Sequence, residues 1–459
     1  MTNRLQTWPD RWCTATGKDA FEVVTSGSRG WAQHYSQSGA KFIRVGNLDH
    51  DSISLDLRNL QRVQPPVGAE GQRTRLQGND LLISITAELC MVAVVPYDIG
   101  EAYINQHIAL ARPRVGWEPR FLAWYFASEA DGKRTLKESG RGGTKVGLGL
   151  DDIRNAPIPA APLQEQQRIA DKLDTVLTRV DAVNTRLARV APVLKRFRQS
   201  VLAAATSGRL TEDWREQCEA ESCRTFALSD LVVSIDQGWS PKCEANTAPP
   251  DRWAVIKTTA IQALHFYPEE NKALPNDLDP RPNLAIADGD VLITRAGPRS
   301  RAGIACVVKG DHPMLMLCDK AYRIRVDHSK VLPQMLNLHL NSPEILEVID
   351  GMKTGISESG VNLTQAKFRE LALSVPRIAE QAEIVRRVET LFAFADRLET
   401  RLHAAQAATE RMTPALLAKA FRGELVPQDS NDEPASELLR RLQQEAPSTN
   451  TRRRRKSAA

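Results

Sequence analysis

The sequence lacks the marks of several large protein classes. It has no run of 18 apolar residues, which a membrane-spanning helix requires, and residues 1–10 contain no apolar secretory segment. Its seven cysteines form no Cys-x-x-Cys pair and lie near no histidine cluster, so neither a zinc site nor a disulfide framework is expected. We therefore expect a reduced, cytoplasmic protein with no metal centre and no membrane partner.

Motifs for catalysis are also missing. The string closest to an adenine methyltransferase motif, Ala248-Pro-Pro-Asp251, lacks the polar first residue and the final aromatic. The glycine-rich residues 140–149 resemble a phosphate loop, but Leu148 stands where a Walker motif has lysine, which favours a surface loop. No nuclease or helicase motif is found, and the eight histidines are dispersed. We expect no catalytic residue and no cofactor bound by this chain.

What the chain does have is an internal repeat. Residues 151–210 align with residues 366–425 without a gap, at a constant offset of 215. The parts in front of them match more loosely, with residues 80–84 pairing with residues 290–294. The chain is thus predicted to use one unit twice, each time a variable module followed by a long helix. Matching pairs include Glu165/Glu380, Gln166/Gln381, Gly208/Gly423 and Gly27/Gly238.

Each repeated segment carries a heptad pattern. Apolar residues alternate at spacings of four and three, which predicts a helix that buries one narrow stripe against a partner helix. Two matched seams in one chain favour helices that face each other, with packing of each stripe on its own module as the alternative. Pro192 and Pro414 are expected to kink or break the helices. The seam residues are Ile169, Leu173, Val180, Leu187, Leu194, Ile384, Val388, Leu391, Leu398 and Leu402.

The modules in front of the helices are expected to be α+β. Short β-branched runs bounded by glycine, proline or aspartate predict strands, and residues 121–128 and 334–350 have helical patterns. The predicted strands cover residues 80–85, 92–95, 291–294, 304–308 and 322–326.

Recognition is the function that remains. A net charge of +5 and a pI near 8.8 favour a polyanionic partner only slightly. Arg295, Arg299 and Arg301 lie in a loop bounded by glycine and proline, and a guanidinium donates two hydrogen bonds at once to guanine or phosphate. This loop is predicted to contact DNA, with a solvated charged loop as the alternative. Further DNA-contact candidates are Lys257, Lys242, Trp31, Lys41, Arg44, Arg73 and Arg75.

Two further segments bear on how the chain would bind DNA. The loop of the first module that corresponds to the arginine loop, Thr86–Cys90, is not basic, so the two modules are expected to read different DNA sequences. The run Arg452–Lys456 is expected to be a solvated end, with non-specific attraction to phosphate as the alternative.

Several strings resemble the specificity subunits of type I restriction–modification systems. Pro162-Leu-Gln-Glu-Gln166 at the start of the first heptad helix and residues 415–427 at the end of the second resemble the two conserved spacers of that family. Residues 103–109 (Tyr-Ile-Asn-Gln-His-Ile-Ala) and residues 431–439 are similar to other parts of it. The resemblance covers nearly the whole chain.

The resemblance implies an α+β architecture of two α/β target-recognition domains separated by two long antiparallel coiled-coil spacer helices, related by a pseudo-twofold repeat. Each domain would read one half of a split site in double-stranded DNA. Two modification subunits would dock on this scaffold, and restriction subunits would join to cleave unmethylated DNA. S-adenosylmethionine, Mg and ATP would be bound by these partner subunits and not by this chain.

The expected domain boundaries follow from the repeat and from the resemblance. They are residues 1–160 for the first target-recognition domain, 161–215 for the first spacer helix, 216–376 for the second target-recognition domain, 377–426 for the second spacer helix, and 427–459 for a tail with a short helix and a basic end.

The heptad seam also suggests a spacing rule for the DNA target. The 32 steps from Ile169 to Val201 would span roughly 48 Å in a straight helix, more than one turn of DNA at about 34–36 Å. The target is therefore expected to be two short blocks around a fixed run of unread base pairs. Two alternatives stay open: a coiled-coil adaptor that binds protein without reading DNA, and an enzyme with an unrecognised site.

Overall fold

The computed structural model describes residues 8–27, 29–65, 69–86, 88–140, 147–219 and 223–445. The chain divides into two compact units, the first formed by Met1–Arg186 with Ala405–Ala459 and the second by Leu187–Ala404. The basic run Arg452–Lys456 and most of the glycine-rich stretch, residues 141–146, lie outside the described residues.

The first unit is built on a four-stranded antiparallel sheet. Its interior strand β6 (Leu81–Ser84) is buried along its whole length, as expected for an apolar run between polar turns. Helix α3 (Pro119–Ala127) joins the same core through aromatic side chains, with Phe121 and Phe126 buried. The strands follow in the order β2 (Phe21–Ser26), β9 (Ile108–Pro113), β6 and β7 (Val92–Val94).

A smaller sheet lies in the same unit. Its strand β4 (Ala40–Ile43) pairs antiparallel with β5 and parallel with β8, so the sheet is mixed. Side chains of the two sheets meet in one apolar cluster that includes Ile43, Leu82, Ile104 and Leu110. The strand order is β3 (Tyr35–Ser36), β5 (Gln61–Val63), β4 and β8 (Ala102–Ile104).

Short elements complete this part of the first unit. Strand β1 (Cys13–Thr16) pairs with β10 (Pro157–Ala160), which ties the start of the described chain to the segment that enters the first long helix. The short helices are α1 (Gly17–Ala20), η1 (Trp31–His34), η2 (Val45–Asn47), α2 (Ala69–Arg73), α4 (Gly132–Ser139) and α5 (Leu150–Asn155).

The second unit repeats this plan, as the sequence repeat predicts. Strand β11 (Arg224–Ala227) pairs with β25 (Ala372–Val375) as β1 pairs with β10, and the small sheet again contains one parallel pair, β13 with β21. The main sheet has the order β12 (Val232–Gln237), β22 (Ala321–Val326), β18 (Val291–Thr294) and β20 (Ala305–Val307); the small sheet has the order β16 (Asn271–Ala273), β13 (Ala254–Ile256), β21 (His312–Met316) and β17 (Ala285–Ile286).

The expectation of a single helix over residues 334–350 is wrong. α10 (Pro333–Leu340) stops before Ser342, whose hydroxyl caps α11 (Pro343–Met352) by accepting a hydrogen bond from a first-turn amide. Pro343 has no amide hydrogen, so it begins a helix readily but cannot continue one. The other short elements are α9 (Leu228–Leu231), η4 (Thr258–Ala260), β14 (Ile261–Gln262), β15 (His265–Phe266), η5 (Pro282–Leu284), β19 (Ala296–Gly297), β23 (Thr354–Ser357), β24 (Gly360–Asn362) and α12 (Gln365–Arg369).

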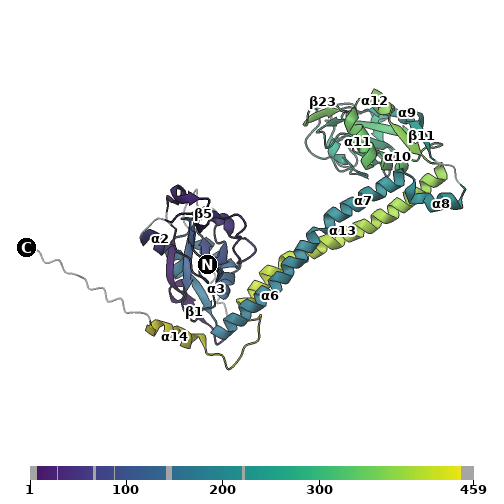
Figure 1. Ribbon diagram of the computed structural model, residues 1–459. Helices are drawn as coiled ribbons and strands as arrows, with labels where there is room; N and C mark the ends of the chain where they lie inside the picture. The colour runs from purple at the N-terminus through teal and green to yellow at the C-terminus, as the bar shows by residue number, and fades with distance from the viewer. Residues whose placement is uncertain are drawn as a thin grey trace, which may run out of the picture. The chain divides into compact units, whose positions relative to one another are not determined.

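Two long helical segments run side by side (Figure 1). One consists of α6 (Leu163–Ala188) and α7 (Val190–Thr206), and the other is α13 (Ile378–Ala420). They are antiparallel, because the start of α6 shares a core with the end of α13 in the first unit, and α7 shares a core with the start of α13 in the second. The predicted α+β fold with a long helix pair is confirmed.

The two prolines affect the helices differently. The first segment breaks at Arg189, so that Pro192 lies in the first turn of α7, where a missing amide hydrogen costs little. The second segment continues through Pro414 to Ala420, so of the expected kink or break at this proline, a break does not occur.

Burial of the seam residues varies along the helix pair. Val183 and Met412, which share the heptad rhythm, are 41% and 43% exposed. The described seam residues that are buried are Ile169, Leu173, Val180, Leu194, Ile384, Val388 and Leu402; those that are half-buried are Leu187, Leu391 and Leu398.

The segments that follow the long helices fold back onto the units. Gly208 and Gly423 adopt left-handed conformations, with φ of 77° and 73°, as expected for glycines that end a helix. In the first unit Arg168 binds the carboxylate of Asp432 at 2.6 Å, ahead of α14 (Ala435–Glu445). The second unit has η3 (Arg209–Thr211) and α8 (Glu212–Gln217) in the corresponding place.

Candidate nucleic-acid interface

A buried Glu-Gln pair fixes each domain to the start of its long helix. The side-chain oxygen of Gln166 accepts a hydrogen bond from the amide of Glu118 at 3.0 Å, and its nitrogen donates to the carbonyl of Ala161 at 2.8 Å. Gln381 makes the same two kinds of contact, with the amide of Leu332 and the carbonyl of Pro376, both at 2.8 Å. The repeated Glu-Gln string therefore sets the position of each sheet relative to its own helix.

The neighbouring glutamates have different partners. Glu165 accepts a hydrogen bond from the indole of Trp12 at 3.0 Å and another from Gln428, and burial raises the pKa of its carboxyl. Glu380 accepts a hydrogen bond from the hydroxyl of Thr211 at 2.8 Å and lies 3.4 Å from the guanidinium of Arg215. In each unit one partner of the glutamate, Gln428 or Thr211, belongs to a segment that folds back on the domain.

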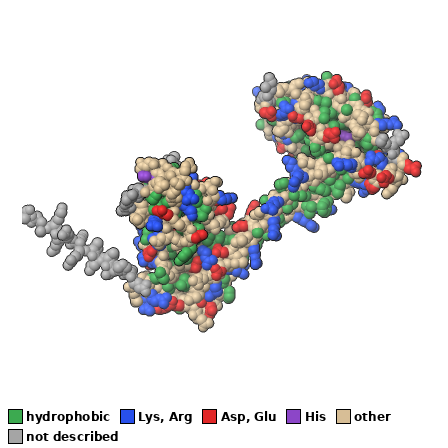
Figure 2. All heavy atoms as spheres, in the orientation of Figure 1, with side chains coloured by type: hydrophobic (Ala, Val, Ile, Leu, Met, Phe, Trp, Pro, Cys, Tyr) green, Lys and Arg blue, Asp and Glu red, His purple; other side chains and the backbone are tan. Residues whose placement is uncertain are grey.

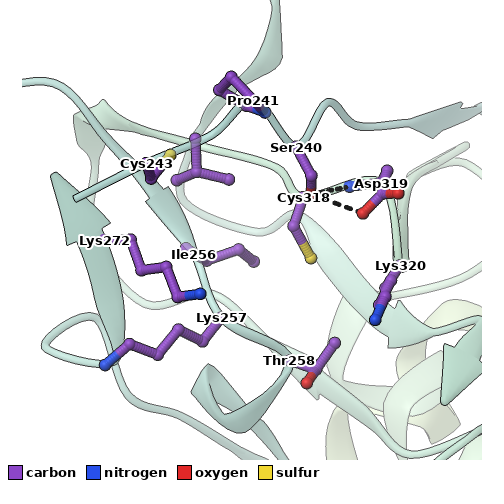
Figure 3. Close-up of a pocket in the computed structure, with 11 residues that line it drawn as sticks. Ser240, Pro241, Cys243, Ile256, Lys257, Thr258, Lys272, Cys318, Asp319 and Lys320 are labelled. Atoms are coloured by element: carbon purple, nitrogen blue, oxygen red, sulfur yellow. Dashed lines mark hydrogen bonds between the residues drawn. The ribbon is translucent and has the colours of Figure 1, made fainter. Parts of the chain in front are cut away.

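The second unit has a hollow of about 310 Å³ beside the end of β13 and the turn that precedes β22 (Figure 3), which we call the lysine hollow. Three of its lining residues are lysines, and Figure 3 shows the amino groups of Lys257 and Lys272 on one side and that of Lys320 on the other. The lining residues are Ser240, Pro241, Cys243, Val255, Ile256, Lys257, Thr258, Lys272, Cys318, Asp319 and Lys320.

The lysine hollow is cationic, with three lysines against one carboxylate. That carboxylate, Asp319, accepts a hydrogen bond from the hydroxyl of Ser240 at 2.5 Å. Lys257 is half-buried, and its amino group lies 3.6 Å from the carboxylate of Glu270, a residue that does not line the hollow. Lys272 and Lys320 are exposed. Burial raises the pKa of the Cys318 thiol to about 11, so this sulfur stays protonated and contributes no charge.

The first unit has a hollow of about 420 Å³ at the end of β4, which we call the amide hollow. Asn47 is committed to the fold, since its amide donates to the carbonyl of Asp56 and its oxygen accepts from the amide of Arg44. The ring of His107 lies 2.6 Å from the hydroxyl of Thr86. The lining residues are Arg44, Val45, Gly46, Asn47, Asn59, Asn105 and His107.

The two hollows occupy matching places in the repeat. Arg44 and Lys257 each follow the strand that makes the parallel pair, and each precedes a short 3₁₀ helix. His107 and Lys320 each stand directly before a strand of the main sheet, β9 and β22. Two positions that differ in side chain thus have the same backbone surroundings.

Beside each hollow, one glycine allows two backbone segments to approach each other closely. A Cβ added at Gly27 would lie 2.3 Å from the carbonyl oxygen of Asn105, and one at Gly238 would lie 2.1 Å from that of Leu317. Any side chain at these positions would push apart the two strands that border the hollow. Glycine is therefore required at both.

The arginines of the predicted DNA-contact loop are engaged within the protein. Arg295 donates to the carbonyl of Asp319 at 3.0 Å, and Arg299 binds the carboxylate of Asp350 at 2.6 Å. Arg301 donates to the carbonyls of Thr258 and Ile261 and to the side chain of Gln262, at 2.7, 3.0 and 2.8 Å. Arg295 and Arg301 thereby join the loop to two walls of the lysine hollow.

The remaining DNA-contact candidates fall into two groups. Trp31 is 3% exposed and stacks on Phe42 at 5.4 Å, and Lys41 donates to the carbonyl of Ile99 at 2.6 Å, so the positions of both side chains suit packing more than a DNA contact. The exposed candidates are Lys242, Arg44, Arg73 and Arg75, of which Arg44 lines the amide hollow.

Sequence reasoning did not name Lys272, Lys320, Asn105 or His107 as candidates for DNA contact, although residues 103–109 form a string that resembles the family. Lys272 lies within β16, and the other three lie in the turns just before β9 and β22. A signal was nevertheless present, because the string Asn105-Gln-His107 aligns with Cys318-Asp-Lys320 when the strands that follow them are matched. That alignment would have shown that the two turns occupy matching positions in the repeat.

In the part of the chain that the structure describes, no three side chains of His, Cys, Asp or Glu gather in a group that could hold a metal ion. No helix there is both long enough and apolar enough to cross a membrane. All seven cysteines are unpaired, and burial raises the pKa of Cys306 to about 12.

Comparison with known sequences points to one family. Residues 36–191 match the family described as type I restriction modification DNA specificity domain. The chain is 34% identical over 282 residues to the type I restriction enzyme EcoKI specificity subunit of Escherichia coli strain K12, covering 60% of this chain and 59% of that one. It is 30% identical over 329 residues to the EcoDI specificity subunit of Escherichia coli, covering 67% of this chain and 70% of that one.

The coverage of relatives is partial, whereas the fold matches almost throughout. The chain aligns with only 34% to 60% of the length of four such relatives, of which the EcoKI subunit is one. The crystal structure of an HsdS subunit from Thermoanaerobacter tengcongensis is similar with a TM-score of 0.60 at 19% identity, over 93% of this chain and 100% of that one.

Proposed function

The chain belongs to the family of type I restriction enzyme specificity subunits, and from that membership we propose that it selects the DNA sequence on which a type I restriction–modification complex acts. One observation carries the proposal. The same α/β plan occurs twice, and each copy has a hollow with at least one basic side chain in the same place. Two copies of one reading unit with different hollows suit a target of two different halves.

We further propose that residues 1–160 and 216–376 are target-recognition domains, each reading one half-site in double-stranded DNA. Residues 161–215 and 377–426 would be the spacers, and residues 427–459 a tail. Because the repeat is pseudo-twofold, the two domains would read opposite strands, with unread base pairs between the blocks. The buried Glu-Gln pairs support this division, since each holds one sheet to one helix start.

The proposed complex supplies the chemistry through other chains. Two modification subunits would methylate adenine with S-adenosylmethionine, and restriction subunits would use ATP and Mg, so this chain would be a non-catalytic subunit without a cofactor. Figure 2 shows hydrophobic side chains along the long helices on the face that it draws. Among the exposed apolar side chains of these helices are Val193 and Phe394 in the second unit, at 50% and 48% exposure. Exposed apolar side chains on a helix surface suit docking of partner subunits. We place this function in the cytoplasm, where the DNA substrate lies.

A gel-shift experiment with a pool of random-sequence duplexes tests the proposal. The purified chain with its modification subunits should select duplexes that share a split motif, and the chain alone should neither methylate nor cleave DNA. Selection of no sequence by a folded complex would favour a protein-binding adaptor. Methyl transfer or cleavage by the chain alone, in a preparation free of partner subunits, would show that it is an enzyme.

A further inference from the structure

The two domains have the same arrangement of backbone segments around their hollows, but different side chains line the hollows. The glycine that closes the backbone beside each hollow, Gly27 or Gly238, is the same in both units. The residue after the parallel strand changes from Arg44 to Lys257, and the residue before the main-sheet strand changes from His107 to Lys320. Where two copies of one fold carry different side chains at matching backbone positions, those side chains allow the copies to bind different partners.

We infer that the two hollows are the places where each domain reads the base edges of its half-site, an inference that rests on the proposed function. In the lysine hollow, the amino groups of Lys257, Lys272 and Lys320 are donors, and the one carboxylate of the lining, Asp319, already accepts a hydrogen bond from Ser240. Guanine is the base whose major-groove edge presents two acceptors, O6 and N7, and lysine pairs with that edge. The second half-site therefore contains a guanine where this hollow contacts it.

The amide hollow has a different recognition chemistry. Arg44 supplies donors, whereas the amides of Asn59 and Asn105 can supply a donor and an acceptor. The oxygen of Asn105 accepts a hydrogen bond from the amide of His107, which orients the side chain. Asparagine pairs with the N6 and N7 of adenine, and arginine with guanine. The first half-site is therefore read by a mixed set of donors and acceptors, and the two halves differ in sequence.

The arginine loop has a supporting role in this arrangement. Arg301 donates to the carbonyls of Thr258 and Ile261, on the wall that follows Lys257, and Arg295 donates to the carbonyl of Asp319, next to Lys320. These bonds occupy the guanidinium groups and hold two of the lysines at a fixed separation. The lysines face the solvent from the walls that the arginines join.

Single substitutions in the complete complex test the inference. Lys257→Ala and Lys320→Ala should each relax one position of the second block, and Arg44→Ala one position of the first, in the map of methylated adenines from cells that express the complex. Binding to a duplex with the preferred base should weaken by roughly 5- to 150-fold, the range for loss of one base-specific pair. Lys367→Ala, an exposed lysine on α12 that lines neither hollow, is the matched control and should change neither block.

Each other result overturns the inference in its own way. If the lysine variants weaken binding to all duplexes evenly and flatten its salt dependence while the motif is unchanged, the hollow holds backbone phosphate and does not read bases. Unchanged affinity and motif would show that the hollow does not face DNA. A parent complex with no split motif would instead remove the proposed function, so the two failures are distinguishable.

Discussion

The two units share one interaction, a buried aspartate paired with an arginine on the neighbouring strand, but its geometry differs between them. In the first domain Arg112 binds Asp80 through two nitrogens, at 2.7 and 2.8 Å, and the aspartate side chain is 1% exposed. In the second domain Arg325 binds Asp290 at 3.1 Å and is 48% exposed itself. The ion pair thus occurs at the same position of both repeats, but it is longer and its arginine is more exposed in the second unit.

The difference has a local cause. Arg323, 3% exposed in the second domain, lies 4.0 Å from the carboxylate of Asp290 and binds Asp236 at 2.9 Å. A second cation therefore shares the role that Arg112 fills alone. The comparison teaches that a repeat can keep the same pair of residues, Asp80–Arg112 and Asp290–Arg325, while a further cation nearby changes the geometry of the pair.

The largest effect is expected when these arginines are replaced. Arg112→Met should lower the free energy of unfolding by about 3–5 kcal/mol, because it leaves a buried carboxylate without its partner. Arg325→Met should cost about 1 kcal/mol or less, since Asp290 keeps Arg323 nearby and Arg325 is half exposed. Denaturant unfolding of the two variants measures the difference; equal losses would show that the two pairs are equivalent.

The paired glycines should respond alike. Gly27→Ala and Gly238→Ala should each cost about 3 kcal/mol, because the new methyl group would meet a backbone carbonyl at 2.3 or 2.1 Å. Gly351→Ala, in α11 with no atom within 4 Å of the added carbon, should instead stabilise by roughly 0.5–1 kcal/mol. Thermal unfolding checks all three, and tolerance of alanine at only one of the paired sites would break the equivalence of the hollows.

The two buried glutamates offer a smaller contrast. Glu165→Ala should cost about 1–3 kcal/mol because the indole of Trp12 and the amide of Gln428 lose their acceptor. Glu380→Ala should cost a similar amount through Thr211 and Arg215. Unfolding by denaturant compares them, and a loss at only one site would mean that only one domain depends on its folded-back segment.

Acid titration sharpens this contrast at Glu165. Burial raises the pKa of its carboxyl in the folded state, so the stability tied to its neutral form is present below the unfolded pKa and is lost as the pH rises through the folded one. Glu165→Gln, which is neutral throughout, should therefore gain stability relative to the parent as the pH rises through that window. A difference that does not change with pH would exclude a raised pKa.

The last contrast lies within the arginine loop, where one arginine binds backbone carbonyls and another binds a partly exposed carboxylate. Arg301→Ala should cost about 1.5–3 kcal/mol, because its guanidinium donates charge-assisted hydrogen bonds to two backbone carbonyls. Arg299→Ala should cost less than about 1 kcal/mol, since its ion pair with Asp350 is partly exposed. Thermal unfolding ranks them; a larger loss for Arg299 would mean that the loop is held mainly from α11.

Much of the fold could be predicted from the sequence, because its signals are local or repeated. The apolar run at residues 81–84 predicts a buried strand, and the heptad rhythm predicts the long helices. The break before Pro343 also had a local signal, since Ser342 and Pro343 form a helix start. The prediction missed it because the apolar pattern continues across the break.

The side chains that are available for contact with DNA were harder to predict, because their surroundings depend on distant parts of the chain. Arg301 meets carbonyls some 40 residues away, at Thr258 and Ile261, and no pattern around the arginine reveals them. Trp31 follows a glycine in what reads as a loop, yet its ring is buried against Phe42 and Tyr103. Composition shows which side chains could meet DNA, and only the fold shows which are already engaged.

A map of methylated adenines after a domain exchange tests the central claim most directly. In cells that express the complex, the parent chain should give two short blocks separated by a fixed run of unread base pairs. Replacing residues 20–150 with the matching module of a relative should change one block and leave the other block and the gap intact. A contiguous motif in the parent, or a change in both blocks after the exchange, would contradict the account of one domain for each half-site.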